Sequence, residues 1–191
     1  MDTLHPTLWR TCRILGGATR LALLRAVVDS PDQSVGHLAT GLGLSLPRAS
    51  QELRRLQSRG LIQARRQGLH VLYHPEADRE IAAAAPLLQA LRESFRSYPS
   101  DEDGRCQQIA AAFSHPRRLA LIRWLSNGPA GARLLEEGTG ISRDALNRHL
   151  LKLVQAGLAR REGRKILAAD PGHPLARFLL GLARSTPTPA S

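Results

Sequence analysis

The sequence contains few cysteines and few aromatic residues. Its 191 residues include two cysteines, Cys12 and Cys106, which lie far apart and form no CxxC pair. Such spacing argues against a disulfide framework and against a zinc finger. Aromatic residues make up only 4% of the chain, which leaves few rings for stacking on unpaired bases and disfavours RNA as a ligand.

Long apolar runs are absent as well. No run approaches the ~20 apolar residues of a membrane span. The segment 1–13 has no basic stretch followed by an apolar one, as a secretory signal would. We therefore expect a cytoplasmic protein without a membrane partner.

The sequence shows no catalytic or metal-binding motif. A nucleophile elbow, a phosphate-binding glycine loop and an HExxH motif are all missing. The histidines are scattered: His37 stands alone, His173 has no Asp-x-His partner, and His115 lies at a helix start, which favours a structural role. We therefore expect neither an enzyme nor a cofactor, and no metal site.

Positive charge is what the chain has in excess. The net charge is +11, and nearly all of the cations are arginines, since Lys152 and Lys165 are the only lysines. Arginine binds phosphates and guanine edges well, but a preference for arginine codons would produce the same composition. The position of the arginines along the chain must decide between a binding role and codon preference.

The chain carries an internal repeat. The hexamer "RLALLR" (20–25) returns as "RLALIR" (118–123). When one residue is deleted from the loop, the match continues, and "GLGLS" (41–45) aligns with "GTGIS" (138–142). Two chance hexamers would not stay in register over about 50 residues. The sequence thus predicts a duplicated domain. Its parts are domains at 1–97 and 105–185, a linker rich in Pro, Ser and acids at 98–104, and a disordered tail at 186–191.

Each copy predicts the same elements in the same order. These are a first helix at about 4–16 and 104–114, a second over each hexamer, and a third at about 34–41 and 131–137. A glycine turn leads to a fourth helix, which Ser45 or Ser142 would cap and which Gly60 or Gly157 would end. A hairpin with a basic tip follows in each copy.

The fourth helix has one apolar and one polar face. The apolar stripe consists of Ala49, Leu53 and Leu56 in the first copy and of Leu146, Leu150 and Leu153 in the second. Mainly basic and amide side chains fall on the opposite face. The stripe predicts that this face packs on the domain and that the opposite face meets solvent or a ligand.

Both copies resemble the ArsR-type bacterial repressors. The second copy carries the closer match, in "HPRRLALIRWL" (115–125) and "SRDALNRHLLKLVQAGLARREGR" (142–164). The first copy departs from the pattern at Pro47 and at Glu52, where the second copy has His149.

The resemblance covers most of 9–75 and 106–168. It implies a mainly α fold with small β-hairpin wings (α+β), a winged helix-turn-helix in each copy. In that family the fourth helix enters the major groove of double-stranded DNA, and the wing approaches the backbone or the minor groove. The resemblance thus implies a sequence-specific, nucleoid-associated transcriptional regulator, most simply a repressor.

The fourth helices and the wings supply the candidate DNA-binding residues. In 45–66 six arginines stand against one glutamate, and in 142–165 seven cations stand against two acids, a net charge of +5 in each window. Codon bias does not explain that concentration, whereas binding to phosphates does. The candidates are Arg48, Ser50, Gln51, Arg54, Arg55, Arg65, Arg66, Arg143, Asn147, Arg148, Lys152, Arg160, Arg161, Arg164 and Lys165.

Members of this family are usually homodimers joined by their first and last helices, so two copies in one chain predict an intramolecular pseudo-dimer. The apolar segments 79–95 and 174–185 would meet the first helices there, including Leu8 and Trp9, and Pro86 would bend or split the first segment. An unidentified small-molecule effector would act at this interface. Because the two fourth helices differ, the expected DNA site is asymmetric. Whether two such chains form a further homodimer stays open.

Several alternatives stay open. Winged helices also serve as protein-interaction scaffolds, and Leu151 favours that role because it lies on the outward face where the first copy has Arg54. Non-specific nucleic-acid binding is a second alternative. Cys12 and Cys106 could form a redox pair between the first helices, although two buried small side chains are the favoured interpretation.

Overall fold

The computed structural model describes residues 8–81 and 83–185. The first half, up to Ser97, contains α1 (Leu8–Leu15), α2 (Ala18–Asp29), β1 (Gln33–Ser34), α3 (Val35–Gly41), α4 (Leu46–Gln57), β2 (Gln63–Gln67), β3 (His70–His74) and α5 (Ala84–Ser97). The second half contains the 3-10 helix η1 (Ser100–Glu102), α6 (Asp103–Phe113), α7 (Pro116–Ser126), β4 (Ala130–Gly131), α8 (Ala132–Thr139), α9 (Arg143–Gln155), β5 (Ala159–Glu162), β6 (Lys165–Ala168) and α10 (Pro174–Ser185). After η1, the second half repeats the element order of the first.

Each half holds one small antiparallel sheet. β2 pairs with β3 and β5 with β6, which confirms both predicted hairpins. A two-residue strand joins each hairpin and gives the strand orders β1-β3-β2 and β4-β6-β5. The sequence did not predict β1 or β4, because two residues carry no alternating pattern. The fold is therefore mainly helical with small antiparallel sheets, as the α+β class requires.

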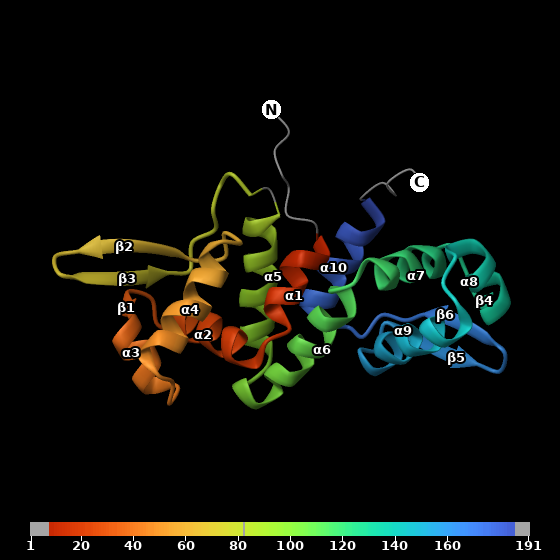
Figure 1. Ribbon diagram of the computed structural model, residues 1–191, viewed down its shortest axis with the longest axis horizontal. Coiled ribbons are helices and arrows are strands. Elements are labelled where there is room, and N and C mark those ends of the chain that lie inside the picture. Colours follow the sequence, from red (N-terminus) through yellow and green to blue (C-terminus); the bar gives the residue numbers. More distant parts are fainter. Residues whose placement is uncertain (1–7, 82, 186–191) are drawn as a thin grey trace.

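Corresponding helices of the two halves meet in the middle of the molecule. The β2–β3 hairpin lies at one end and the β5–β6 hairpin at the other, with α1, α5, α6 and α10 between them (Figure 1). Within this region α1 packs against α6 and α5 packs against α10. Leu15, Ile109, Phe113 and Leu179 are all buried, so these helices share a continuous apolar core.

Cys12 and Cys106 are buried free thiols. Burial raises the pKa of both, that of Cys106 to about 11. Thiols with so high a pKa are almost fully protonated at neutral pH and react slowly. Their burial favours the interpretation as small core side chains.

The start of α5 corrects one prediction. The helix begins at Ala84, so residues 79–81 precede it, and Pro86 lies in its first turn instead of bending or splitting a longer helix. Proline is tolerated there because the amides of the first turn have no partner within the helix.

The N-termini of α4 and α9 correct a second prediction, that serine side chains cap these helices. Ser45 and Ser142 occupy the N-cap positions, but neither side chain accepts a capping hydrogen bond. Histidines followed by proline cap other helices instead. His115 Nδ1 and His173 Nδ1 each accept from the amide two residues on, at 3.1 and 3.2 Å, at the starts of α7 and α10.

In the segment 98–104, predicted as a solvated linker, residues 99–102 and 104 are exposed, but Tyr98 and Asp103 make specific contacts that the sequence did not predict. Tyr98 stacks on the ring of His173 with 4.7 Å between centroids. The helix η1 follows, and Asp103 opens α6 in an ion pair with Arg25. The aromatic stack and the ion pair hold this segment against both halves.

Two predictions lie outside the described residues: the first helix before position 8 and the disordered tail at 186–191. None of the described helices combines the length and the apolar character that a membrane span requires.

Candidate nucleic-acid interface

α4 and α9 each have one buried apolar face and one exposed polar face. The predicted stripes are buried at Ala49, Leu53, Leu56, Leu146, Leu150 and Leu153. Ser50 is half-buried. The other candidates on the two helices are exposed: Arg48, Gln51, Arg54, Arg55, Arg143, Asn147, Arg148 and Lys152. The helical period thus placed the candidates on the outward face.

Each of these helices leads into its hairpin through a left-handed glycine. Gly60 and Gly157 have φ angles of +68° and +69°. The amide of the leucine that follows each glycine donates to a carbonyl in the last turn of the helix, at 3.2 Å in the first half and 2.9 Å in the second. A larger residue would be strained in this conformation. The glycines therefore fix the direction in which each hairpin leaves its helix.

In the first half, acidic side chains neutralise two of the candidate arginines. Arg55 Nη1 lies 2.9 Å from Glu52 Oε1, and Arg65 on the β2–β3 hairpin pairs with Glu76. Among the described residues no ion pair forms with the remaining first-half arginines of the candidate set, which are Arg48, Arg54 and Arg66. The cationic face of α4 is therefore partly neutralised.

Glu52 was not a candidate, yet it organises this helix. Its carboxylate is buried and lies 2.8 Å from Arg20 Nη1 as well as 2.9 Å from Arg55 Nη1. Burial alone would raise the pKa of Glu52, but the hydrogen bonds and charges of the two arginines outweigh burial and lower it. The ionised carboxylate ties α4 to α2. A lone acid in a cationic helix was the only signal in the sequence, and its partner lies 32 residues earlier.

In the second half more of the positive charge is free. Arg143 Nη2 lies 2.5 Å from Glu136 Oε2, and Arg160 Nη1 lies 2.5 Å from Glu162 Oε1. Within the described part of the chain, no ion pair forms with the other second-half cations of the candidate set, which are Arg148, Lys152, Arg161, Arg164 and Lys165. Exposed cations without an internal partner can neutralise phosphates.

The structure brings four second-half candidates together at one pocket. The pocket is lined by Arg143 and Asn147 on α9, by Arg161 and Arg164 on the β5–β6 hairpin, and by Arg133 on α8. The sequence did not point to Arg133, because the third helix carries no basic pattern of its own. Arg133 pairs with Glu137 and Arg143 with Glu136, so Arg161 and Arg164 are the guanidinium groups of this pocket that have no ion pair among the described residues. These two suit the oxygens of a phosphodiester backbone.

α9 also exposes apolar side chains. Leu151 is 56% exposed and Val154 is 43% exposed. With Asn147 they follow an i, i+4, i+7 spacing, so all three share one face of the helix. That face lies beside Arg161 of the β5–β6 hairpin. The corresponding positions of α4 hold Ser50, Arg54 and Gln57.

His149 takes the place of Glu52 in α9. Its ring lies 4.6 Å, centroid to centroid, from the ring of His115 at the start of α7. Burial, followed by the neighbouring positive groups, lowers the pKa of His149 to about 4. A neutral ring contact thus joins α9 to α7 where an ion pair joins α4 to α2.

Among the described residues, no three His, Cys, Asp or Glu side chains come close enough together to hold a metal ion. The sequence matches no protein-family model and no curated protein.

Proposed function

We propose that this chain is a sequence-specific transcriptional regulator that binds double-stranded DNA through two tandem winged helix-turn-helix units. The observation that carries the proposal is the combination, in each half, of an exposed cationic helix face with a basic hairpin. An α-helix fits the major groove of B-DNA. In this proposal α4 and α9 enter major grooves, and the hairpins neutralise phosphates.

The two halves would act as an intramolecular pseudo-dimer. The packing of α1 on α6 and of α5 on α10 supports this relation, and a hydrogen bond repeated within each half supports the equivalence of the two units. Arg25 Nη1 donates to the carbonyl of Phe95 at 3.0 Å, and Arg123 Nε donates to the carbonyl of Ala183 at 2.7 Å. In each half, an arginine of the second helix thus binds a carbonyl near the end of the last helix. Two units held by one packed middle can bind neighbouring grooves of one duplex.

The two units would recognise different half-sites. The outward positions of α4 hold Ser50, Arg54 and Gln57, which suit the hydrogen-bonding edges of guanine and adenine. The same positions of α9 hold Asn147, Leu151 and Val154, which suit adenine and the thymine methyl group. The proposed site is therefore asymmetric, with the A/T-richer half under α9.

Protein binding by the second half is the other candidate function. The exposure of Leu151 and Val154 favours it, because neighbouring apolar side chains on a surface often mark a protein contact. In that case α4 would bind DNA and α9 would hold a protein partner.

Selection of binding sequences from a random pool of duplexes, with the full chain as bait, tests the proposal. The expected product is a motif of two unlike half-sites whose centres lie about 10 base pairs, or a multiple of that, apart. Enrichment of one half-site alone would favour the protein-binding role of the second half. Retention without any motif would contradict sequence-specific regulation and indicate non-specific binding.

A further inference from the structure

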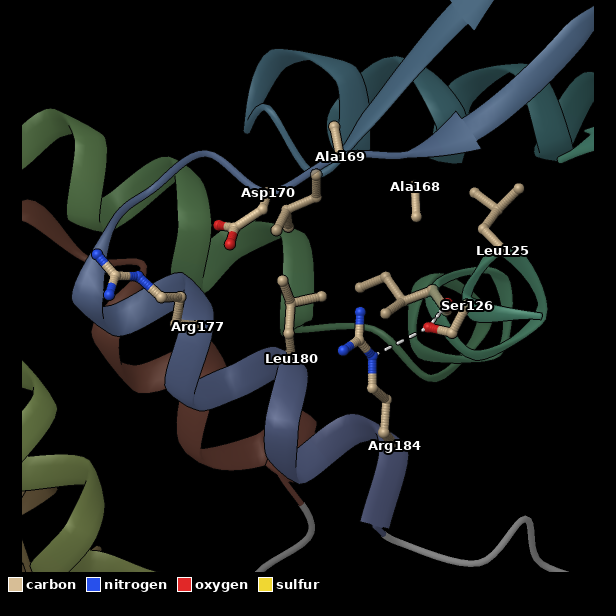
Figure 2. Close-up of a pocket in the computed structure, with 10 residues that line it drawn as sticks. Leu125, Ser126, Ala168, Ala169, Asp170, Arg177, Leu180 and Arg184 are labelled. Carbon is tan, nitrogen blue, oxygen red and sulfur yellow. Dashed lines mark hydrogen bonds between the residues drawn. The ribbon is translucent and has the colours of Figure 1, made fainter. Parts of the chain in front are cut away.

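A cavity of about 220 Å³ lies in the second half, where α7, α10 and the end of β6 meet (Figure 2). Its apolar wall consists of Ile122, Leu125, Leu158 and Leu180. Sites for drug-sized ligands usually measure about 300–1,000 Å³, so this cavity fits a smaller molecule. Its wall belongs both to the central helices and to the base of the second hairpin.

The first half has its own side chain at the corresponding place. Aligning α5 with α10 at their prolines places Arg92 opposite Leu180, and aligning the hairpins by strand pairing places Pro75 opposite Ala168. Arg92 is half-buried, and its Nη2 donates to the carbonyl of Pro75 at 2.5 Å. Leu180 is shorter and uncharged, so it cannot make this contact. The space next to it and Ala168 is the cavity.

Three charged side chains line this cavity: Asp170, Arg177 and Arg184. Arg177 Nη2 donates to the Gly172 carbonyl at 2.9 Å, and in Figure 2 its guanidinium points away from Leu180, which leaves Asp170 and Arg184 as the charges next to the apolar wall. In Figure 2 the side chain of Leu180 lies between the carboxylate of Asp170 and the guanidinium of Arg184. Asp170 Oδ1 accepts from the Gly172 amide at 2.8 Å, and Arg184 Nε donates to Ser126 Oγ at 3.3 Å. Neither Asp170 nor Arg184 is in an ion pair with another described residue. Both side chains are held by these single hydrogen bonds and retain free atoms for a ligand.

We propose that this cavity binds a small zwitterion whose ammonium and carboxylate groups are separated by an apolar body, as in an ω-amino acid. The ammonium group binds Asp170, on the side where the first half places the guanidinium of Arg92. The carboxylate binds Arg184, and the apolar body covers Leu180. Opposite charges on two sides of an apolar wall select against molecules that carry only one charge. This site does not depend on DNA binding.

Isothermal titration calorimetry of the full chain with 6-aminohexanoate tests the site. For a ligand of this size we expect a Kd of about 1 mM or tighter. Hexanoate lacks the ammonium group and hexylamine lacks the carboxylate, so each should bind more weakly, by up to about fivefold, as the loss of one exposed ion pair implies. Absence of binding by 6-aminohexanoate, or equally tight binding of hexanoate, would overturn the proposal.

Substitutions at two exposed residues test which group of the ligand each charged side chain binds. Asp170→Asn should weaken 6-aminohexanoate about fivefold and leave hexanoate unchanged, and Arg184→Gln should weaken 6-aminohexanoate about as much and leave hexylamine unchanged. Arg96→Gln is the matched control, because Arg96 is the first-half counterpart of Arg184 and should not affect binding. Leu180→Arg introduces the first-half residue and should abolish binding. Because Leu180 is buried, circular dichroism must show that this variant is folded. Unchanged affinity in both Asp170→Asn and Arg184→Gln would contradict the assignment.

Discussion

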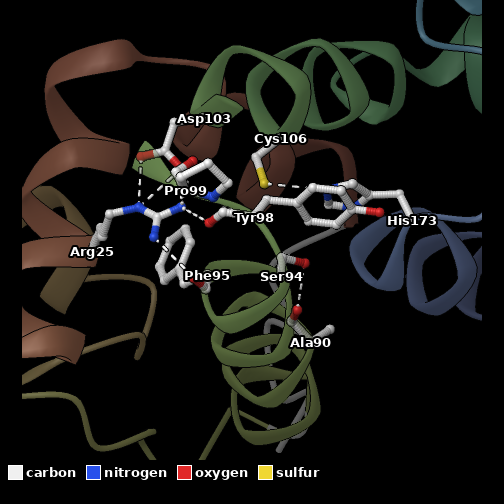
Figure 3. Close-up of polar contacts among 9 residues, drawn as sticks. All are labelled: Arg25, Ala90, Ser94, Phe95, Tyr98, Pro99, Asp103, Cys106 and His173. Atoms are coloured by element: carbon white, nitrogen blue, oxygen red, sulfur yellow. Dashed lines mark hydrogen bonds and ion pairs between the residues drawn. The ribbon is translucent and has the colours of Figure 1, made fainter. Parts of the chain in front are cut away.

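Arg25 in α2 and Asp103 in α6 form a two-point ion pair that joins the two halves of the chain. Arg25 Nε lies 3.0 and 2.9 Å from the two carboxylate oxygens, and Nη2 lies 2.5 Å from one of them (Figure 3). The same guanidinium donates to the carbonyls of Phe95 and Tyr98 at 3.0 and 3.1 Å, and it lies over the Phe95 ring. One buried side chain thus binds the end of α5 and the start of α6.

Removal of Asp103 should destabilise the protein strongly. Asp103→Ala leaves the buried guanidinium of Arg25 without its counter-charge, and losing one partner of a buried pair costs about 3–5 kcal/mol. We expect a loss of about 3 kcal/mol in the free energy of unfolding, measured by urea denaturation. Asp101→Ala is the matched control, because this exposed residue of η1 should cost less than about 0.5 kcal/mol. Equal effects of the two substitutions would contradict the role of the pair.

Acidification should destabilise the fold through His149 and His173. Burial, followed by nearby positive charges, lowers the pKa of both to about 4 from the ordinary 6.5. Between about pH 4 and pH 6.5 the unfolded chain therefore binds more protons than the folded chain. The stability contributed by the neutral rings is therefore complete above pH 6.5 and is lost as the pH falls towards 4.

Urea midpoints at pH 7.5 and pH 5 measure this effect. The parent should be less stable at pH 5, and His173→Asn should lose less on acidification, since asparagine can replace the N-cap of α10 without titrating. His37→Asn, at an exposed position, should behave like the parent. A midpoint that is the same at both pH values would refute the assignment.

Arg161 should contribute to the salt dependence of DNA binding. Each neutralised phosphate adds about 0.9 to the slope of log affinity against log salt concentration. Arg161→Gln should lower that slope by about this amount, as measured by fluorescence anisotropy between about 50 and 200 mM salt. Arg96→Gln removes the same charge from the exposed surface of α5 and should leave the slope unchanged. A slope that falls equally in both variants would mean that only net charge matters.

Leu151 should recognise thymine methyl groups. Replacing thymine by uracil in the half-site under α9 removes a methyl group, whose burial is worth about 0.8 kcal/mol. We expect binding to weaken about threefold to fivefold per contacted base, as measured by anisotropy. The same replacement under α4 should have no such effect, and Leu151→Ala should abolish the difference between thymine and uracil. Insensitivity to uracil in both half-sites, with binding otherwise intact, would favour protein contact by Leu151.

Local pattern predicted the parts of the fold that depend on neighbouring residues. The stripes that include Leu53 and Leu150 follow the helical period, and the hairpins follow from the glycine tips and basic strands between apolar anchors. The repeat of the hexamers indicated the repeated order of elements. The outward positions of α4 and α9 followed from the same period.

Contacts between distant residues could not be predicted in this way. Nothing near Asp103 in the sequence indicates Arg25, 78 residues earlier, and the segment therefore resembled a solvated linker. Glu52 looked like a departure from a cationic helix because Arg20, its partner, lies on another element. The cavity next to Leu180 exists because one residue differs between two structurally equivalent positions, which only the folded chain reveals.

Anisotropy titration of the full chain with the duplex recovered by selection, against a shuffled duplex of the same length and composition at about 150 mM salt, tests the central claim most directly. Specific regulators prefer their site by about 10³-fold or more, and we expect at least that ratio. Equal affinity for the two duplexes, falling steeply with salt, would contradict sequence-specific regulation. No measurable binding to either duplex would contradict DNA binding altogether.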